Sequence, residues 1–113
     1  MEPAIVIAPY RCKTENQEKL FEVLKDKRKY FLEAGYVTER KPILMRSRKD
    51  KEVILEIFEW TSDKHTNDAH KDPKVLDYWG KMDKLCTAIG FPLREISEAD
   101  ESFAHFDPLN IYY

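Results

Sequence analysis

Residues 53 to 60 form an apolar run whose pattern predicts a strand that is buried on both faces. Val53, Leu55 and Ile57 would lie on one face, and Ile54, Phe58 and Trp60 on the other, because successive side chains of a strand point to opposite sides. Residues 4 to 12 repeat this two-sided pattern. A chain of this length has helices for only one face of the sheet. We therefore expect a second copy of the chain to cover the other face.

Two long amphipathic helices are predicted between the strands. The first follows a capping-box pattern at Thr14 and Gln17 and ends at Gly35. The second begins at Asp72-Pro73, where an N-cap residue precedes a first-turn proline, and ends at Gly90. Each has apolar residues at helical spacing on one stripe, namely Leu20, Phe21, Leu24, Phe31 and Ala34 in the first and Val75, Trp79, Met82, Cys86 and Ile89 in the second. A short helix capped by Thr61 or Ser62 is expected to run through His70.

Two further strands complete the expected set of elements. Residues 36 to 48 read as a strand interrupted near Pro42, and the polar residues 49 to 51 form a hairpin turn into the strand at 53 to 60. Residues 91 to 96 read as a last strand that Pro92 breaks early. In the first strand, Pro9 indicates an edge position or a bulge, because proline cannot donate a ladder hydrogen bond.

The order strand, helix, strand, strand, helix, strand is that of an α+β, ferredoxin-like βαββαβ fold. Right-handed crossovers place both helices on one side of a four-stranded antiparallel sheet. The other side would expose a large apolar patch, which sheet-to-sheet dimerisation into an α+β barrel would bury. We expect residues 1 to 96 to form this domain. Residues 97 to 113 carry several aromatic side chains and are predicted to be a C-terminal arm that packs on the dimer.

Composition narrows the classes of partner. The chain has 113 residues, is 42% hydrophobic and carries a formal net charge of -2, so it offers no basic stripe for nucleic acid. Its longest apolar runs are strand-sized, so no membrane partner is expected. Residues 1 to 12 lack the pattern of a secretory leader, and a cytoplasmic location is predicted. Cys12 and Cys86 are expected to be free thiols, because no further cysteine completes a metal site.

Several side chains are candidates for chemistry. His70 could act as a general base near neutral pH, or it could space the helix junction and meet water. Glu59 could orient His70 or ligate a cation, or it could be solvated or paired with a lysine. The aromatic residues that could line a cavity, or simply pack the core, are Tyr10, Tyr36, Trp60 and Trp79. His65 and His70 lie five residues apart rather than four and have no obvious third ligand, so no metal site is predicted.

Phe58-Glu59, Ala69-His70, Asp72-Pro73 and the helix that bears Tyr78 and Trp79 resemble the antibiotic-biosynthesis-monooxygenase-like group of the dimeric α+β barrel proteins. The resemblance implies a homodimer and a mostly apolar pocket between sheet and helices. Some members of the group oxidise quinol-like or anthrone-like aromatics with molecular oxygen and no metal or flavin, and others cleave haem. The chain departs from the haem-degrading pattern, since Pro9 and Tyr10 stand where that branch has a first-strand asparagine.

Two functions follow from the resemblance. The first is a cofactor-independent, monooxygenase-like enzyme acting on a planar aromatic substrate, with His70 as its base. The alternative is a non-catalytic dimer that binds a small ligand or has a structural role. An imidazole inside a cavity with a second polar group in reach favours catalysis, whereas one on the outer surface favours binding or structure.

Overall fold

The computed structural model describes residues 2–113 and contains one antiparallel sheet in the order β4-β1-β3-β2-β5. The strands are β1 (Ala4–Arg11), β2 (Ile43–Ser47), β3 (Val53–Trp60), β4 (Ala88–Ile89) and β5 (Phe106–Pro108). The first four strands have the ferredoxin-like order, so the predicted α+β fold is confirmed. The fifth strand is an addition, because we expected four.

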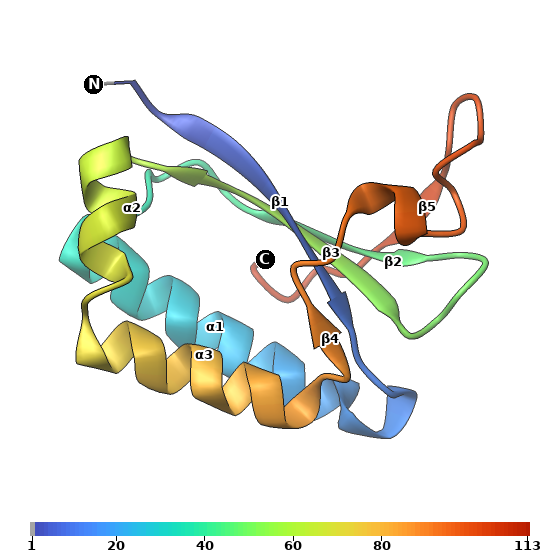
Figure 1. The fold of residues 1–113 in the computed structure, drawn as a ribbon, viewed down its shortest axis with the longest axis horizontal. Helices are drawn as coiled ribbons and strands as arrows, with labels where there is room; N and C mark the ends of the chain where they lie inside the picture. Colours follow the sequence, from blue (N-terminus) through green and yellow to red (C-terminus); the bar gives the residue numbers. More distant parts are fainter. Residues whose placement is uncertain (1) are drawn as a thin grey trace.

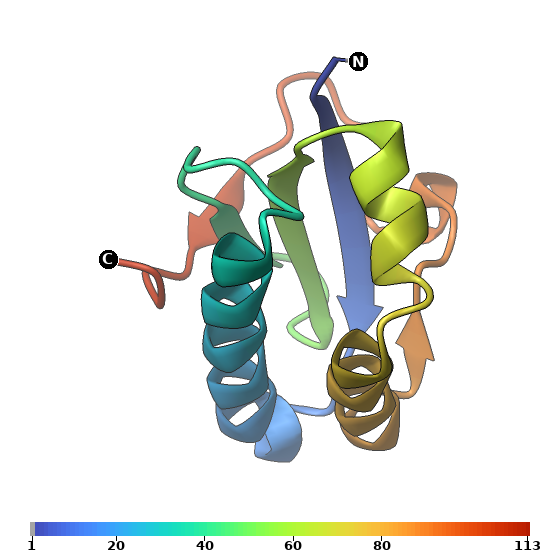
Figure 2. The same ribbon diagram turned by 90° about the vertical axis from the view of Figure 1, so that its left-hand side faces the viewer.

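Both long helices, α1 (Gln17–Ala34) and α3 (Pro73–Leu85), lie on one side of the sheet, and the short helix α2 (Asp63–Ala69) lies beside them (Figures 1 and 2). The predicted stop at Gly35 is confirmed, since this glycine has φ 78°, a left-handed conformation that costs other residues more. Of the two candidate caps of α2, Ser62 is the one used, and its hydroxyl accepts a hydrogen bond from the backbone N–H of His65. Asp72 caps α3, as predicted.

The predicted capping box at Thr14 and Gln17 is wrong. A short 3-10 helix, η1 (Thr14–Asn16), precedes α1, and no side chain caps either of them. The side-chain amide of Gln17 donates instead to the carbonyl oxygens of Cys12 (3.0 Å) and Lys51 (2.7 Å). These two bonds tie the start of the helix to the end of β1 and to the β2–β3 turn.

The end of the second long helix and the last strand also differ from the prediction. The helix α3 stops at Leu85, five residues before Gly90, and Cys86 is already extended. The following strand, β4, is Ala88–Ile89 and lies before Gly90, whose φ of 74° turns the chain away from the sheet. Residues 91 to 96 are therefore not a strand. They form a loop and the 3-10 helix η2 (Leu93–Glu95).

Pro9 does not lie at a sheet edge, because β1 is bordered by β3 on one side and β4 on the other. The carbonyl oxygen of Pro9 accepts a hydrogen bond from the backbone N–H of Gly90 at 2.8 Å, so the backbone of Pro9 faces β4. The register continues from Tyr10–Ile89 to place Gly90, just beyond the end of β4, opposite Pro9, so the missing N–H removes at most one hydrogen bond at the end of this short ladder. The short neighbour explains why proline is tolerated in this strand.

The main core lies between the helices and the even-numbered side chains of β1 and β3, which include Tyr10 and Ile54. On the other side of the sheet, the segment after β4 crosses part of the surface (Figure 1), and Val53 and Leu55 are buried there. The chain therefore supplies some of the second cover itself, which corrects the expectation that all of it comes from another copy. Ile5 and Ile43 remain more than half exposed, at 58% and 51%.

The tail passes from one face of the sheet to the other around its β2 edge. Strand β5 pairs with β2, and the backbone N–H of Leu109 donates to the carbonyl oxygen of Leu44 at 2.8 Å. The last residues then lie beside α1 (Figure 2), where Tyr112 is partly buried against the main core. The division at residues 96 and 97, and any contact of the tail with a second subunit, stay predictions.

Within residues 2–113, the thiols of Cys12 and Cys86 are free, as expected. No helix in this part of the chain combines the length and the apolar character needed to cross a membrane.

Candidate functional site

A cavity of about 630 Å³ opens between the sheet and the helices α2 and α3. Its wall is mostly apolar, and its inner end is formed by the buried residues Tyr10, Lys27 and Met82. The exposed residues His70, Gly80, Asp83, Ile89 and Gly90 form its rim. The remaining lining residues are Val6, Ala8, Phe58, Trp60, Thr66 and Trp79. The volume suits a ligand of a few fused rings.

His70 lies at the C-cap of α2 and has a fixed ring. Its Nδ1 is 2.7 Å from the carbonyl oxygen of Thr66. A carbonyl oxygen can only accept, so Nδ1 carries the proton and the neutral ring has its free lone pair on Nε2. The ring of Trp79 packs edge-on against the imidazole, with centroids 4.9 Å apart. The imidazole can therefore accept a proton at Nε2 without changing its orientation.

Aromatic rings form the wall next to His70. Phe58 and Trp60 pack edge to face at 5.2 Å, and Phe31 supports Trp60 from behind at 5.8 Å. Phe58 and Trp60 project from the helix-side face of β3, two residues apart, as the strand period requires. Flat aromatic walls of this kind favour planar ligands through stacked and edge-to-face contacts.

A buried polar cluster lies at the inner end of the cavity. The ammonium of Lys27 is 2.8 Å from Glu56 Oε1, and the hydroxyl of Tyr10 donates to the same oxygen at 2.6 Å. The hydroxyl of Tyr112 donates to Glu56 Oε2, also at 2.6 Å. Lys27 and Glu56 are only 3% and 2% exposed. The cluster joins α1, β1, β3 and the tail around one carboxylate.

The protonation of this cluster follows from its contacts. Burial alone would raise the pKa of the Glu56 carboxyl, but the charge of Lys27 and the three hydrogen bonds outweigh it and leave that pKa below its ordinary value. Burial and the neighbouring Glu56 raise the pKa of Tyr10 and of Tyr112. Glu56 is thus ionised and both phenols are neutral donors at neutral pH.

Four of the six residues proposed from the sequence come together at this cavity, namely Tyr10, Trp60, His70 and Trp79. Tyr36 does not line it. Its hydroxyl donates to Asp72 at 2.7 Å, and this bond, with partial burial, raises the pKa of Tyr36 to about 12. This hydroxyl braces the N-terminus of α3.

Glu59 is also outside the cavity, because its odd-numbered position places it on the opposite face of the sheet from Phe58 and Trp60. It accepts a hydrogen bond from Thr38 at 2.8 Å and pairs with Arg40 at 3.3 Å. The structure does not bring Glu59 together with His70, and Thr66 orients that imidazole instead.

Sequence reasoning missed Lys27 and Glu56, although each left a signal. Lys27 follows Leu24 by three residues and precedes Phe31 by four, so it lies on the apolar stripe of α1. Glu56 lies between Ile54 and Phe58 on the helix-side face of β3. Opposite charges at two core positions are expected to pair, since an isolated buried charge is very costly.

No group of three or more His, Cys, Asp or Glu side chains that could hold a metal ion occurs in residues 2–113. His65, the other histidine of α2, has its Nδ1 2.7 Å from the Ser62 hydroxyl. It therefore belongs to the N-cap of the helix, while His70 stands at the opposite end.

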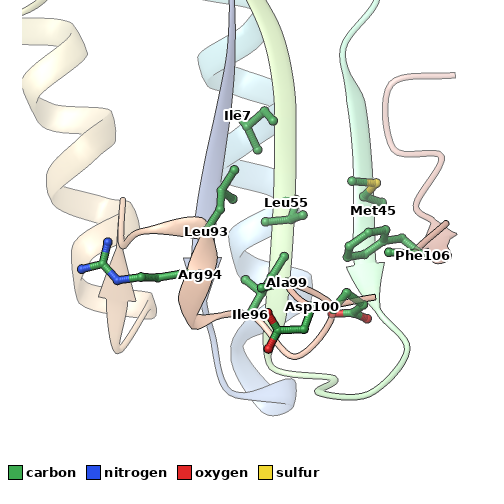
Figure 3. Close-up of a pocket in the computed structure, with 11 residues that line it drawn as sticks. Ile7, Met45, Leu55, Leu93, Arg94, Ile96, Ala99, Asp100 and Phe106 are labelled. Atoms are coloured by element: carbon green, nitrogen blue, oxygen red, sulfur yellow. The ribbon is translucent and has the colours of Figure 1, made fainter. Parts of the chain in front are cut away.

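A second cavity, of about 500 Å³, lies on the other face of the sheet. Figure 3 shows Ile7 and Leu55 on the strands, with Leu93 and Ile96 from the segment after β4 beside them. Of the charged groups at this cavity, Arg94 and Asp100 are exposed. Glu98 is buried, and its carboxylate accepts hydrogen bonds from the Ser47 hydroxyl and the backbone N–H of Arg48. This second cavity contains no histidine and no buried ion pair, so we place the candidate site in the cavity beside His70.

No protein-family profile matches this chain, and no curated protein is significantly similar to it in sequence. Its fold is similar to the solved structure of Rv0793 from Mycobacterium tuberculosis, with 20% sequence identity and a TM-score of 0.60. The similarity covers 85% of this chain and 100% of the other. At this level of identity the likeness shows a shared α+β fold and nothing about activity.

Proposed function

We propose that the protein is a homodimer of the antibiotic-biosynthesis-monooxygenase-like group that binds a planar aromatic molecule in the cavity beside His70. One observation carries the proposal, namely that His70, Trp60 and Trp79 line a single cavity with an apolar, aromatic wall. A cavity of about 630 Å³ accepts two or three fused rings. The comparison in fold supports the α+β fold that this proposal requires.

The reaction that fits the site is oxygenation of the bound aromatic by molecular oxygen. His70 Nε2 takes a proton from a phenol or from an acidic ring CH₂, because Nδ1 is already committed to Thr66. The resulting anion reacts with O₂ to give a peroxide. When the starting group is a CH₂ between two rings, loss of water from the peroxide leaves a carbonyl. One oxygen atom enters the product and the other leaves as water with both hydrogens, so O₂ takes up all four electrons.

A second candidate is a dimer that binds the ligand without transforming it. The exposure of His70 at the rim favours it, since a base is more effective where water is excluded. In this alternative the imidazole and Trp79 form an edge that holds the ligand. The two candidates share the cavity and differ only in what His70 does.

Dimerisation is supported by the apolar side chains left uncovered on the far face of the sheet. Ile5 and Ile7 on β1 are 58% and 43% exposed, and Ile43 on β2 is 51% exposed. These two strands flank β3, where Ile57 is paired with both Ile7 and Ile43. Leu93, from the segment that crosses this face, is also exposed at 41%. Two such faces packed together would form the barrel that the resemblance implies, with an interface of the order of 1,000 Å² or more.

The test compares His70→Ala with His105→Ala, a substitution of an exposed histidine in the tail. Binding of anthrone is followed by quenching of tryptophan fluorescence, and turnover by oxygen consumption. The oxygenase predicts that His70→Ala loses about a hundredfold to ten-thousandfold in rate while still binding, and that His105→Ala matches the wild type. Binding without oxygen consumption by the wild type would select the non-catalytic alternative. No binding at all would refute the proposed function.

A further inference from the structure

The inner end of the cavity contains a positive charge that the proposed chemistry has not used. Lys27 is 3% exposed and lines the cavity with Tyr10 and Met82, which are buried to the same degree. Besides the Glu56 carboxylate, two aromatic rings lie close to the ammonium, since it is 5.0 Å from the ring centre of Phe58 and 5.5 Å from that of Phe31. A lysine is rarely retained in such a place unless it is paired.

The ammonium has donor capacity to spare. An ammonium group has three N–H donors, and its hydrogen bond in the described part of the chain is the one to Glu56 Oε1. The contacts with Phe31 and Phe58 are cation–π contacts and need no donor geometry. Two N–H groups of Lys27 therefore have no hydrogen-bond partner among residues 2–113, and Lys27 is one of the residues that line the cavity.

Glu56 holds the ammonium in place but does not need a ligand itself. Its Oε1 accepts from Lys27 and Tyr10, and its Oε2 accepts from Tyr112. The carboxylate and the ammonium balance each other in charge, and the phenols are neutral. The inner end therefore presents donors without a net charge, which suits an oxygen acceptor and rejects a cation.

We propose that Lys27 is a specificity-determining residue that selects aromatic ligands with an oxygen acceptor, such as a hydroxyl or a ring carbonyl, on the edge that enters the cavity first. This inference rests on the proposed function, because it assumes that the cavity takes an aromatic molecule. It assigns the two polar groups of the site to opposite ends of the ligand. Lys27 binds oxygen at the inner end, and His70 acts at the rim.

The experiment uses two probes that differ by one oxygen, naphthalene and 2-naphthol, titrated into the full-length protein and followed by NMR. In the wild type, 2-naphthol should bind about tenfold more tightly than naphthalene, since a hydrogen bond from a charged donor exceeds a neutral one. The variant is the double substitution Lys27→Met with Glu56→Gln, which removes both charges together and avoids an unpaired buried carboxylate. It should bind naphthalene as the wild type does and lose the preference for 2-naphthol. Lys25→Met, an exposed lysine of the same helix, is the matched control and should keep the preference.

The outcomes separate this inference from the proposed function. If neither probe binds the wild type, the cavity function fails and the inference fails with it. If naphthalene binds but 2-naphthol is not preferred, or if the double variant keeps the preference, the cavity function stands and the role of Lys27 is refuted.

A measurement on the wild type does not depend on the variants folding. The side-chain Cε resonance of Lys27 should shift strongly with 2-naphthol and only weakly with naphthalene. Equal shifts with both probes would refute the contact.

Discussion

Removing the charge of Lys27 alone should destabilise the fold far more than removing the charges of Lys27 and Glu56 together. In Lys27→Met the carboxylate keeps its hydrogen bonds from Tyr10 and Tyr112 but loses its counter-ion in a site that is 2% exposed. Breaking a buried ion pair in this way costs about 3 to 5 kcal/mol. We expect a value near the lower limit, about 3 kcal/mol, because the two phenols remain. Adding Glu56→Gln should recover most of this loss, since neutral side chains of similar size need no counter-ion.

The size of the loss should depend on pH in a defined direction. In the wild type the pKa of Glu56 is lower in the folded state than in the unfolded chain. The ion pair therefore stabilises the fold at pH values above the pKa of the unfolded chain, and this contribution is lost as the pH falls through the pKa of the folded state. Without Lys27, burial dominates and raises the pKa of Glu56 above its unfolded value. The variant then gains relative stability as the carboxyl is protonated. The difference between Lys27→Met and the wild type should therefore be large at pH 7 and smaller near pH 4.

Urea unfolding followed by circular dichroism at both pH values gives these differences directly. A loss of about 3 kcal/mol corresponds to a melting temperature lower by roughly 12 °C for a domain of this size. Lys25→Met removes an exposed charge that is paired with Glu22 and should cost about 0.5 kcal/mol or less. The reasoning fails if Lys27→Met lies within about 1 kcal/mol of the wild type at pH 7. It fails equally if the double variant is as unstable as the single one.

Three further substitutions test other parts of the structure. Tyr112→Phe removes the donor to Glu56 Oε2 and should cost about 1.5 to 3 kcal/mol in urea unfolding, whereas Tyr113→Phe, at a mostly exposed ring, should leave the unfolding midpoint unchanged. If the proposed dimer forms, Ile7→Lys on the uncovered sheet face should give a monomer in light scattering, and Leu76→Lys on the outside of α3 should not. A wild-type mass of 13.4 kDa would rule out the proposed dimer. Ser62→Ala removes the N-cap of α2 and should lower stability by about 1 kcal/mol, with faster amide exchange confined to that helix as the distinguishing sign.

Local patterns in the sequence predicted most of the fold. The bounds of β3 follow from an uninterrupted apolar run, and the starts of α2 and α3 follow from Ser62 and Asp72, whose capping role depends only on adjacent residues. The last strand could not be predicted in the same way. Residues 91 to 96 have suitable composition, but the strand formed earlier, at Ala88–Ile89, because the chain leaves the sheet at Gly90.

The candidate site was only partly accessible to the same reasoning. His70 was selected because an imidazole can act as a base near neutral pH, and Trp79 because its ring could line a cavity. The structure places the centroids of the two rings 4.9 Å apart. Glu59 was selected as a carboxylate that could orient His70 or ligate a cation, yet its odd position in β3 directs it to the other face. The strand period already contained this information, since Phe58 and Trp60 were assigned to one face of the strand and Glu59 lies between them.

The tail illustrates what sequence patterns leave undetermined. Its aromatic residues indicate burial, and Tyr112 does pack against the core. Nothing local specifies that its hydroxyl donates to a carboxylate 56 positions away. Yet the pattern requires apolar residues at positions 27 and 56, and the opposite charges of Lys27 and Glu56 there predict a buried ion pair. The carboxylate of such a pair needs further hydrogen-bond donors for its second oxygen. Tyr112 supplies one of them, so the tail completes the polar end of the cavity as well as covering the core.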